Sequence, residues 1–257
     1  MEAPTAAERR WRGDERRRAL RILRRVWGHP DFRPEQGPVV EAMLGGRDLM
    51  AVLPTGAGKS VCFQLPALMD RTLTVVVSPL VALMDDQVSG LRRRGVHAVA
   101  AVHGGMRRRV RREALTEAAE GGLRLLYVAP ERLRSRRLAD ALERRGVGRV
   151  VVDEAHCISQ WGHEFRPDYR RIGTFAAAVG APRMAAFTAT ATPRVEEDVV
   201  DSLALRRPAR IRIPVDRPNL RWSAGRVSSR AEGVARLGRL VRRSPGAAIL
   251  YVGTRRR

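Results

Sequence analysis

One short segment combines the residue types that bind phosphate groups. The sequence LPTGAGKS occupies residues 53–60, after an apolar run and before a helix-like stretch. Gly56 and Gly58 let the backbone direct its amides at a phosphate, and the helix N-terminus adds partial positive charge. We expect Lys59 to neutralise the transferring phosphoryl group and the Ser60 hydroxyl to bind Mg²⁺. The segment therefore predicts an ATP- or GTP-binding loop, formed by Pro54, Thr55, Gly56, Ala57, Gly58, Lys59 and Ser60.

Lysine and arginine are used very unequally in this chain. Of the 49 basic residues 48 are arginine, and the only lysine is Lys59. A position that keeps lysine in such a sequence indicates a need for a compact ammonium group rather than a planar guanidinium. The formal net charge of +22 also favours a polyanionic partner, most commonly nucleic acid. An arginine-rich composition on an ordinary surface explains the charge equally well.

Two acidic residues follow another apolar run, in the sequence RVVVDEAH at 149–156. Because the carboxyl ends of parallel strands lie at one edge of a sheet, we expect Asp153 and Glu154 beside the phosphate loop. Asp153 would hold Mg²⁺, and Glu154 would orient or deprotonate an attacking water. His156 would sense the terminal phosphate or couple to a neighbouring motif. An isolated Asp-Glu pair more often begins a capped helix, but this pair follows a buried strand.

Apolar runs alternate with helical stretches from residue 48 onward. Such runs, buried on both faces and separated by helices, predict parallel βαβ units in a doubly wound α/β domain. The expected strands are 48–53, 72–78, 98–103, 123–129, 149–154 and 183–189. The expected helices are 80–94, 106–120, 131–145 and 193–204, together with a basic amphipathic helix at 8–27.

The pattern changes after Leu205. Residues 209–220 are expected to form an extended connection, followed by a helix at 229–243 and a strand at 247–253. We therefore expect one complete domain at 1–205, and a linker with the truncated start of a second α/β domain at 206–257.

The composition argues against disulfide-rich, four-cysteine zinc and membrane-spanning proteins. Two cysteines, Cys62 and Cys157, cannot form a disulfide framework or a four-cysteine zinc site. No apolar run is long enough to cross a bilayer, and the arginine-rich N-terminus does not look like a signal peptide. We expect a cytoplasmic protein with no membrane partner.

Several segments together resemble the RecQ family of DNA helicases, within helicase superfamily 2. PTGAGKS and DEAH are typical of the superfamily. The segment AHCISQWGHEFRPDY (155–169) is similar to the aromatic-rich loop that distinguishes RecQ helicases. The other similar segments are FRPEQ (32–36), VVSPLVALMDDQV (76–88), LLYVAPERL (125–133), DRPNL (216–220) and AILYVGTR (248–255). The resemblance implies a RecA-like domain followed by the beginning of a second RecA-like domain.

The segment before the phosphate loop is expected to select the nucleotide. The Gln36 amide can pair with both N6 and N7 of adenine, which would favour ATP over GTP. Arg33 would stack on the base or contact a phosphate. In the family an aromatic residue often covers the base, whereas His29 occupies that place here, with Trp27 nearby. An ordinary surface loop is the alternative interpretation.

The aromatic-rich loop is expected to sense single-stranded DNA and to relay its presence to the acidic pair. Aromatic side chains stack on unpaired bases and cations follow phosphates, which indicates Trp161, Phe165 and Arg166 as DNA-binding residues. Thr188 and Thr190 would supply coupling hydroxyls from the end of another strand. Burial of Trp161 and Phe165 in a core is the alternative.

The resemblance implies an ATP- and Mg²⁺-dependent helicase that moves 3′ to 5′ on single-stranded DNA and unwinds forked duplexes. It also implies that the protein acts in DNA repair or recombination and is associated with a bacterial nucleoid. One alternative is a nucleotide-gated DNA-binding module with little turnover, because the chain stops before the arginines that a second domain would supply. Another is an RNA helicase of DEAH type.

Three arginine clusters are interpreted as solvated faces. They are Arg92–Arg94, Arg107–Arg112 and Arg255–Arg257.

Overall fold

The computed structural model describes residues 13–161, 164–214, 220–221, 223–243 and 246–251. The chain divides into two compact units, Met1–Val215 and Asp216–Arg257. Within the described ranges, no helix has both the length and the apolar character needed to cross a membrane.

A seven-stranded parallel sheet forms the centre of the first unit, with strand order β3-β4-β2-β5-β6-β1-β7. Its strands are β1 (Leu49–Val52), β2 (Leu73–Val77), β3 (Val99–Val102), β4 (Leu125–Val128), β5 (Val147–Val152), β6 (Met184–Thr188) and β7 (Ala209–Arg212). All residues of β1 to β4 and of β6 are buried, as expected for short apolar runs covered on both faces. The six predicted strands are confirmed, each within a few residues of its expected limits.

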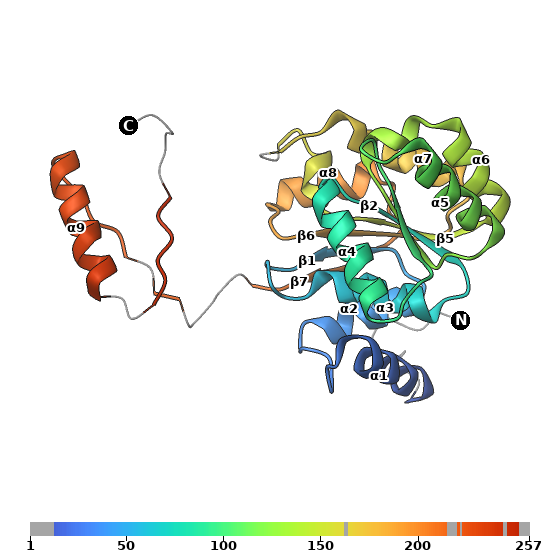
Figure 1. The fold of residues 1–257 in the computed structure, drawn as a ribbon, viewed down its shortest axis with the longest axis horizontal. Coiled ribbons are helices and arrows are strands. Elements are labelled where there is room, and N and C mark those ends of the chain that lie inside the picture. Colours follow the sequence, from blue (N-terminus) through green and yellow to red (C-terminus); the bar gives the residue numbers. More distant parts are fainter. Residues whose placement is uncertain (1–12, 162–163, 215–219, 222, 244–245, 252–257) are drawn as a thin grey trace. The chain divides into compact units, whose positions relative to one another are not determined.

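Helices cover both faces of this sheet (Figure 1). One apolar core lies under α1 to α4, and a second core lies under α5 to α8. Helix α1 lies outside α2 and α3, away from the sheet (Figure 1). The helices are α1 (Gly13–Trp27), α2 (Gln36–Leu44), α3 (Lys59–Met69), α4 (Val81–Arg93), α5 (Arg108–Glu120), α6 (Arg136–Arg145), α7 (Ile172–Ala178) and α8 (Pro193–Ser202), with short 3₁₀ turns η1 (Pro130–Arg134), η2 (Ala155–Ile158) and η3 (Pro167–Arg171). The doubly wound α/β class is therefore confirmed.

Two predicted helices differ from the structure in their extent. The expected helix at 131–145 is divided into η1 and α6, because Ser135 is extended and its Oγ accepts a hydrogen bond from Leu138 N and so caps α6. The basic helix expected at 8–27 is described from Gly13 to Trp27, and its first residues lie outside the described part of the chain.

The segment expected as an extended connection contributes a strand. Residues Ala209–Arg212 form β7 and pair in parallel with β1. The Ala209 amide donates to Asp48 O at 2.8 Å, and the Ile213 amide donates to Val52 O at 3.0 Å. A short strand at a sheet edge is fixed by hydrogen bonds to its neighbouring strand. The local sequence, which has a proline on each side of these residues, does not reveal this pairing. The first compact unit consequently extends to Val215.

The second unit contains helix α9 (Arg230–Arg243), which confirms the helix expected at 229–243. No residue of α9 is buried. The strand expected at 247–253 is not formed at 247–251, and its remaining residues lie outside the described part. A strand needs a neighbour to satisfy its backbone groups, and the described residues of this unit offer none. Whether this unit begins a second RecA-like domain stays a prediction.

Candidate active site

The phosphate loop connects the end of β1 to the start of α3. The Leu53 amide donates to Thr188 O of β6 at 2.9 Å, and the Ala57 amide donates to Pro54 O at 3.1 Å, which closes the turn. Gly56 and Gly58 have φ values of 86° and 78°, a region that glycine adopts without steric cost. The sequence-predicted residues 54–60 therefore form one loop that leads into a helix N-terminus.

The side chain of Lys59 lies under this loop, where its Nζ donates to Leu53 O at 3.3 Å. Ser60 follows it in the first turn of α3 and is half-buried. Both side chains thus begin at the positive end of a helix, where anions are favoured.

The FRPEQ segment packs directly against the loop. Gln36 is buried, and its amide nitrogen donates to Ala57 O at 3.2 Å, while its Oε1 accepts from the Arg33 amide at 3.0 Å. The Arg33 guanidinium donates to Gly56 O. Both residues therefore hold the loop from outside. The polar atoms of Gln36, expected to recognise adenine, are engaged by the backbone of the protein here.

The acidic pair follows β5, two strands from β1 in the sheet order and at the same edge. Asp153 is 9% exposed. Its Oδ1 accepts from the Glu154 amide at 3.0 Å, and its Oδ2 accepts from the Ser78 hydroxyl at 3.4 Å. Burial and the Glu154 charge raise the pKa of Asp153 to about 6, against an opposing effect of the Lys59 ammonium. Lys59 also lowers the pKa of Glu154, so the ammonium and both carboxylates share one electrostatic environment.

Glu154 has an unusual backbone conformation, with φ at 48°. Positive φ in a residue other than glycine is a strained state that tends to occur at functional sites. Its carboxylate lies 3.3 Å from His156 Nδ1. The hydrogen bond with His156 lowers the pKa of Glu154, in spite of partial burial. This carboxylate therefore stays ionised at neutral pH.

His156 joins the acidic pair to the next strand. Its Nδ1 lies 2.9 Å from the Thr188 hydroxyl, which donates in turn to Thr190 O at 3.0 Å. The Cys157 sulfur and the Glu154 carboxylate raise the pKa of His156. Thr188 is fully buried, so its hydroxyl is placed to position His156 rather than to contact DNA directly.

The aromatic-rich loop divides between the surface and the core. Trp161 is 61% exposed and Phe165 is 36% exposed. The Arg194 guanidinium lies 3.4 Å from the centre of the Trp161 ring. Tyr169 is instead fully buried, and its hydroxyl donates to Asp153 O at 3.0 Å. Trp161 and Phe165 thus offer accessible rings, whereas Tyr169 is packed inside the domain and binds the backbone of Asp153.

Arg166 connects this loop to the segment after β2, because its guanidinium donates to Pro79 O at 3.2 Å. His163 lies outside the described residues. The sequence interpretation missed the supporting roles of Ser78, Tyr169 and Arg194. Ser78 could have been found from its place at the end of an apolar run, but the other two contacts depend on tertiary packing alone.

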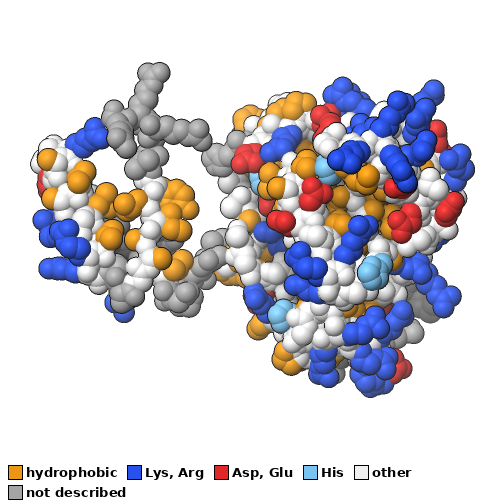
Figure 2. Space-filling view, viewed as in Figure 1, with side chains coloured by type: hydrophobic (Ala, Val, Ile, Leu, Met, Phe, Trp, Pro, Cys, Tyr) orange, Lys and Arg blue, Asp and Glu red, His pale blue; other side chains and the backbone are white. Residues whose placement is uncertain are grey.

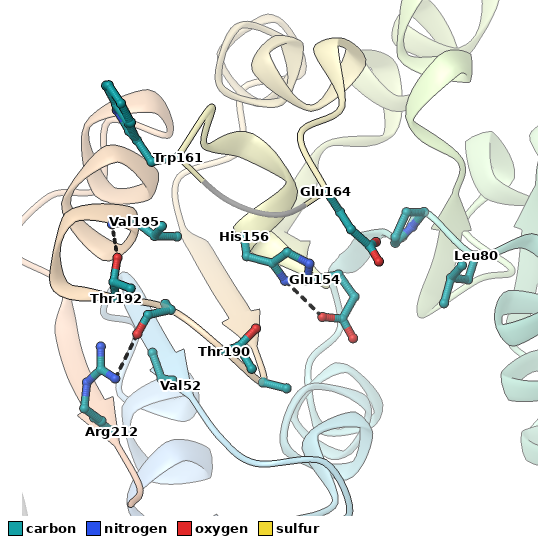
Figure 3. A pocket seen from close by; sticks show the side chains of 13 residues that line it. Val52, Leu80, Glu154, His156, Trp161, Glu164, Thr190, Thr192, Val195 and Arg212 are labelled. Atoms are coloured by element: carbon teal, nitrogen blue, oxygen red, sulfur yellow. Dashed lines mark hydrogen bonds and ion pairs between the residues drawn. The ribbon is translucent and has the colours of Figure 1, made fainter. Parts of the chain in front are cut away.

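A pocket of about 570 Å³ lies between the acidic pair and the aromatic-rich loop. Figure 3 shows Glu154 and His156 facing each other on one side, with Thr192 and Arg212 on the other. Trp161 and Thr190 also line it. Trp161 of the expected DNA-binding loop and the Glu154 carboxylate, which is expected to be catalytic, therefore line the same pocket.

The oxygen donors of the site fit a hard divalent cation. The Ser60 hydroxyl and the Asp153 carboxylate are the two predicted Mg²⁺ ligands, and Mg²⁺ binds through oxygen, with phosphate and water completing its shell. Burial raises the pKa of Asp153 because it disfavours the charged carboxylate. A bound cation would stabilise that charged form.

Comparisons with known proteins agree with this geometry. Residues 33–199 match the family model described as DEAD/DEAH box helicase. The chain is 42% identical to an ATP-dependent DNA helicase RecQ of Synechocystis sp., over 91% of this chain and 50% of that protein. It is 38% identical to a probable ATP-dependent DNA helicase RecS of Bacillus subtilis, over 91% of this chain and 47% of that protein. The chain thus spans about half the length of these curated relatives.

A solved structure of a hypothetical ATP-dependent RNA helicase from Sulfolobus tokodaii superposes with a TM-score of 0.60 at 22% identity, over 78% of this chain and 57% of that one. This likeness confirms the RecA-like fold expected from the sequence, and the curated relatives confirm the resemblance to RecQ helicases. The family match covers well over half of the chain and includes the phosphate loop and the acidic pair. The protein belongs to the DEAD/DEAH box helicase family.

Proposed function

We propose that this chain is the ATP-binding part of a RecQ-type DNA helicase, which couples ATP hydrolysis to 3′-to-5′ movement on single-stranded DNA and to unwinding of forked duplexes in DNA repair or recombination. The observation that carries this proposal is that Lys59, Asp153 and Glu154 share one edge of the sheet and interact electrostatically. The similarity to RecQ proteins over 91% of the chain supports DNA as the partner. We also propose that residues 206–257 provide a linker and the beginning of a second RecA-like domain.

The site residues account for hydrolysis of the terminal phosphate. Loop amides and Lys59 would hold the β- and γ-phosphates, and Ser60 and Asp153 would hold Mg²⁺. The cation, when bound, would neutralise charge on the phosphate oxygens. Glu154 is ionised and would accept a proton from water. The water oxygen then bonds to the γ-phosphorus, and the bond from that phosphorus to the bridging β-oxygen breaks, which releases ADP and phosphate.

DNA binding would act on this chemistry through the aromatic-rich loop. Trp161 and Phe165 present exposed rings, on which unpaired bases stack for about 1–3 kcal/mol each. Tyr169 of the same loop contacts the backbone of Asp153, and His156 contacts both Glu154 and Thr188. A shift of the loop would therefore alter the position of both carboxylates.

A second candidate function is a nucleotide-gated DNA-binding module with little turnover of its own. It is favoured by the second unit, in which α9 has no buried residue. Efficient hydrolysis in related NTPases needs an arginine supplied to the γ-phosphate, which a second domain would provide.

ATP hydrolysis with and without single-stranded DNA separates these functions. We expect DNA to stimulate hydrolysis, and Lys59→Ala to abolish it. Lys59→Arg is the matched variant, because it keeps the charge but replaces the compact ammonium, and we expect it to be nearly as inactive. Absence of DNA stimulation would contradict helicase activity of this chain and favour the binding module. Stronger stimulation by RNA than by DNA would favour an RNA helicase.

A further inference from the structure

Three side chains able to bind a transition metal lie together at the start of the aromatic-rich loop. His156 and Cys157 are consecutive residues of η2, and Glu164 lies further along the loop. The Arg166 amide donates to Cys157 O at 2.9 Å, which folds the loop back onto η2. As a result one nitrogen, one sulfur and one carboxylate oxygen lie within 4.8 Å of one another. We name His156, Cys157 and Glu164 the loop triad.

The distances in the loop triad suit a tetrahedral ion. The Cys157 Sγ atom lies 3.8 Å from His156 Nε2. Around a tetrahedral zinc ion, with bonds of about 2.3 Å to sulfur and about 2.0 Å to nitrogen, these two atoms would be about 3.5 Å apart. The Glu164 side chain is 63% exposed, and the guanidinium of Arg166 lies 3.9 Å from its carboxylate. Packing therefore does not prevent a small shift of this carboxylate towards the ion.

The contacts of His156 orient its ring for metal binding. Its Nδ1 lies 2.9 Å from the Thr188 hydroxyl and 3.3 Å from the Glu154 carboxylate, whereas its Nε2 lies on the side of the Cys157 sulfur. Histidine ligands in metalloproteins almost always donate one ring N–H to a carboxylate or another acceptor, and bind the metal through the other nitrogen. The contacts that fix His156 beside the acidic pair are therefore those that a metal-binding histidine needs.

The ligand atoms select a class of ion. Mg²⁺ and Ca²⁺ bind through oxygen, whereas a set that combines thiolate, imidazole and carboxylate favours zinc and neighbouring transition metals. His156 and Glu164 line the pocket of about 570 Å³, which leaves space for a water molecule as a fourth ligand. Figure 3 shows their side chains on the same side of this pocket as Glu154. The loop triad thus differs in chemistry from the oxygen ligands proposed for Mg²⁺.

The charge of the rest of the molecule opposes unspecific binding of cations. The chain has a formal net charge of +22, and Figure 2 shows Lys and Arg side chains spread over the larger unit, with fewer Asp and Glu side chains among them. Such a field repels a divalent cation, so a cation needs a specific set of ligands to be retained. With two cysteines and five histidines in the whole chain, few other nitrogen and sulfur ligands compete.

We propose that the loop triad binds a divalent cation of the zinc class through His156 Nε2, Cys157 Sγ and a carboxylate oxygen of Glu164, and that the bound ion inhibits ATP hydrolysis. Binding displaces one proton from the Cys157 thiol and one from the His156 imidazolium, and both protons pass to the solvent.

The inhibition follows from what the ion would connect. It would tie Glu164 to η2 and so restrict the shift of the aromatic-rich loop that we propose to carry the DNA signal. It would also place two positive charges near Glu154, and a nearby positive charge makes a carboxylate a weaker proton acceptor. The inhibition rests on the proposed function, whereas the metal site does not.

Titration of the metal-free chain with Co²⁺, in an excess of Mg²⁺, tests the site by absorption spectroscopy. Cobalt replaces zinc in tetrahedral sites, and its bond to a thiolate gives a charge-transfer band that oxygen ligands do not produce. We expect this band to grow up to one equivalent of cobalt and to disappear when Zn²⁺ displaces the cobalt. Cys157→Ser should lose the band. The matched control is Cys62→Ser, because Cys62 is the other cysteine and is equally buried, and this variant should keep the band.

Glu164→Gln gives an independent measurement, because the side chain is exposed and its substitution should leave folding unchanged. Cobalt affinity should fall at least about tenfold, since even groups that only support a metal ligand contribute about 10–100-fold. Glu143→Gln, an exposed substitution on α6 with the same change of charge, should bind cobalt as tightly as the unaltered chain. Zn²⁺ should inhibit DNA-stimulated ATP hydrolysis in the unaltered chain and in Glu143→Gln, whereas Glu164→Gln should need at least about tenfold more Zn²⁺.

Absence of the thiolate–cobalt band in the unaltered chain, or its persistence in Cys157→Ser, would overturn the site. Equal cobalt affinity in Glu164→Gln and Glu143→Gln would exclude the carboxylate ligand and overturn the triad. A cobalt band without any effect of Zn²⁺ on hydrolysis would overturn the inhibition alone. If the unaltered chain hydrolyses no ATP even without Zn²⁺, the proposed function fails and the inhibition with it, while the cobalt titration still decides the metal site.

Discussion

Asp153 carries a buried charge whose removal should stabilise the protein while it destroys the site. The side chain is 9% exposed, and its pKa is about 6 in the folded chain against an ordinary value of 3.8. Substitution Asp153→Asn keeps the shape and both contacts, since the amide oxygen can accept from Glu154 N and the amide nitrogen can donate to Ser78 Oγ. The variant therefore measures the free-energy cost of burying the charge of Asp153.

The direction of the pH dependence follows from proton binding. A carboxyl group whose pKa rises on folding binds more protons in the native state, so stability falls as the pH rises. The fall starts near pH 4 and is complete above pH 6 or so. Linkage between the two pKa values gives a cost of about 2 kcal/mol at pH 5 and about 3 kcal/mol at pH 7.5. The attraction of Lys59 is already included in this shift.

Urea denaturation at pH 5 and pH 7.5, without nucleotide or divalent cations, measures this cost. Asp153→Asn should have a higher free energy of unfolding than the unaltered chain at both pH values, and the difference should be larger at pH 7.5 by roughly 1 kcal/mol. Asp140→Asn, an exposed substitution on α6, controls for the change in net charge. ATP hydrolysis should be lost in the Asp153 variant alone. A variant that is no more stable, or equally stabilised at both pH values, would refute the reasoning.

Substitutions at three further positions test the loop and the sheet. Gly58→Ala places a methyl group 2.3 Å from Gln36 Nε2 at a positive φ of 78°, and should cost about 1–2 kcal/mol of unfolding free energy; an unchanged urea midpoint would contradict it. Gln36→Ala removes the amide that holds the loop and should raise the KM for ATP about tenfold and cost about 1–2 kcal/mol of unfolding free energy, whereas an unaltered KM would exclude this role. Asp48→Ala removes the acceptor for the Met184 and Arg206 amides, at 2.8 and 2.7 Å, and should cost about 2–3 kcal/mol. Asp48→Asn keeps one acceptor and should lose roughly half as much.

Local sequence patterns predicted most of the sheet. Short apolar runs between helices are buried on both faces only in a parallel α/β arrangement, so the six expected strands and the class of fold followed from the pattern. The strand Ala209–Arg212 did not, because its alternating Arg and Ile residues suit an exposed edge. It is fixed by β1 and by ion pairs of Arg210 and Arg212 with Glu197 and Glu196 of α8.

In the candidate site, too, some features could be predicted from the local sequence and others could not. Glycine, lysine and hydroxyl residues at fixed spacing predicted the phosphate loop, since their chemistry depends on neighbours in the chain. The buried position of Tyr169 did not follow from the loop sequence, because aromatic residues serve equally well for stacking and for packing.

The sequence by itself determined the kinds of chemistry present: one ammonium, two carboxylates after an apolar strand, and a glycine-rich turn before a helix. Only the tertiary structure decided which groups act on one another. It places Gln36 against the loop and orients His156 between Glu154 and Thr188. The physical reason is that burial and charge coupling depend on distances between elements remote in the chain, and these distances are set by the packing of helices on the sheet.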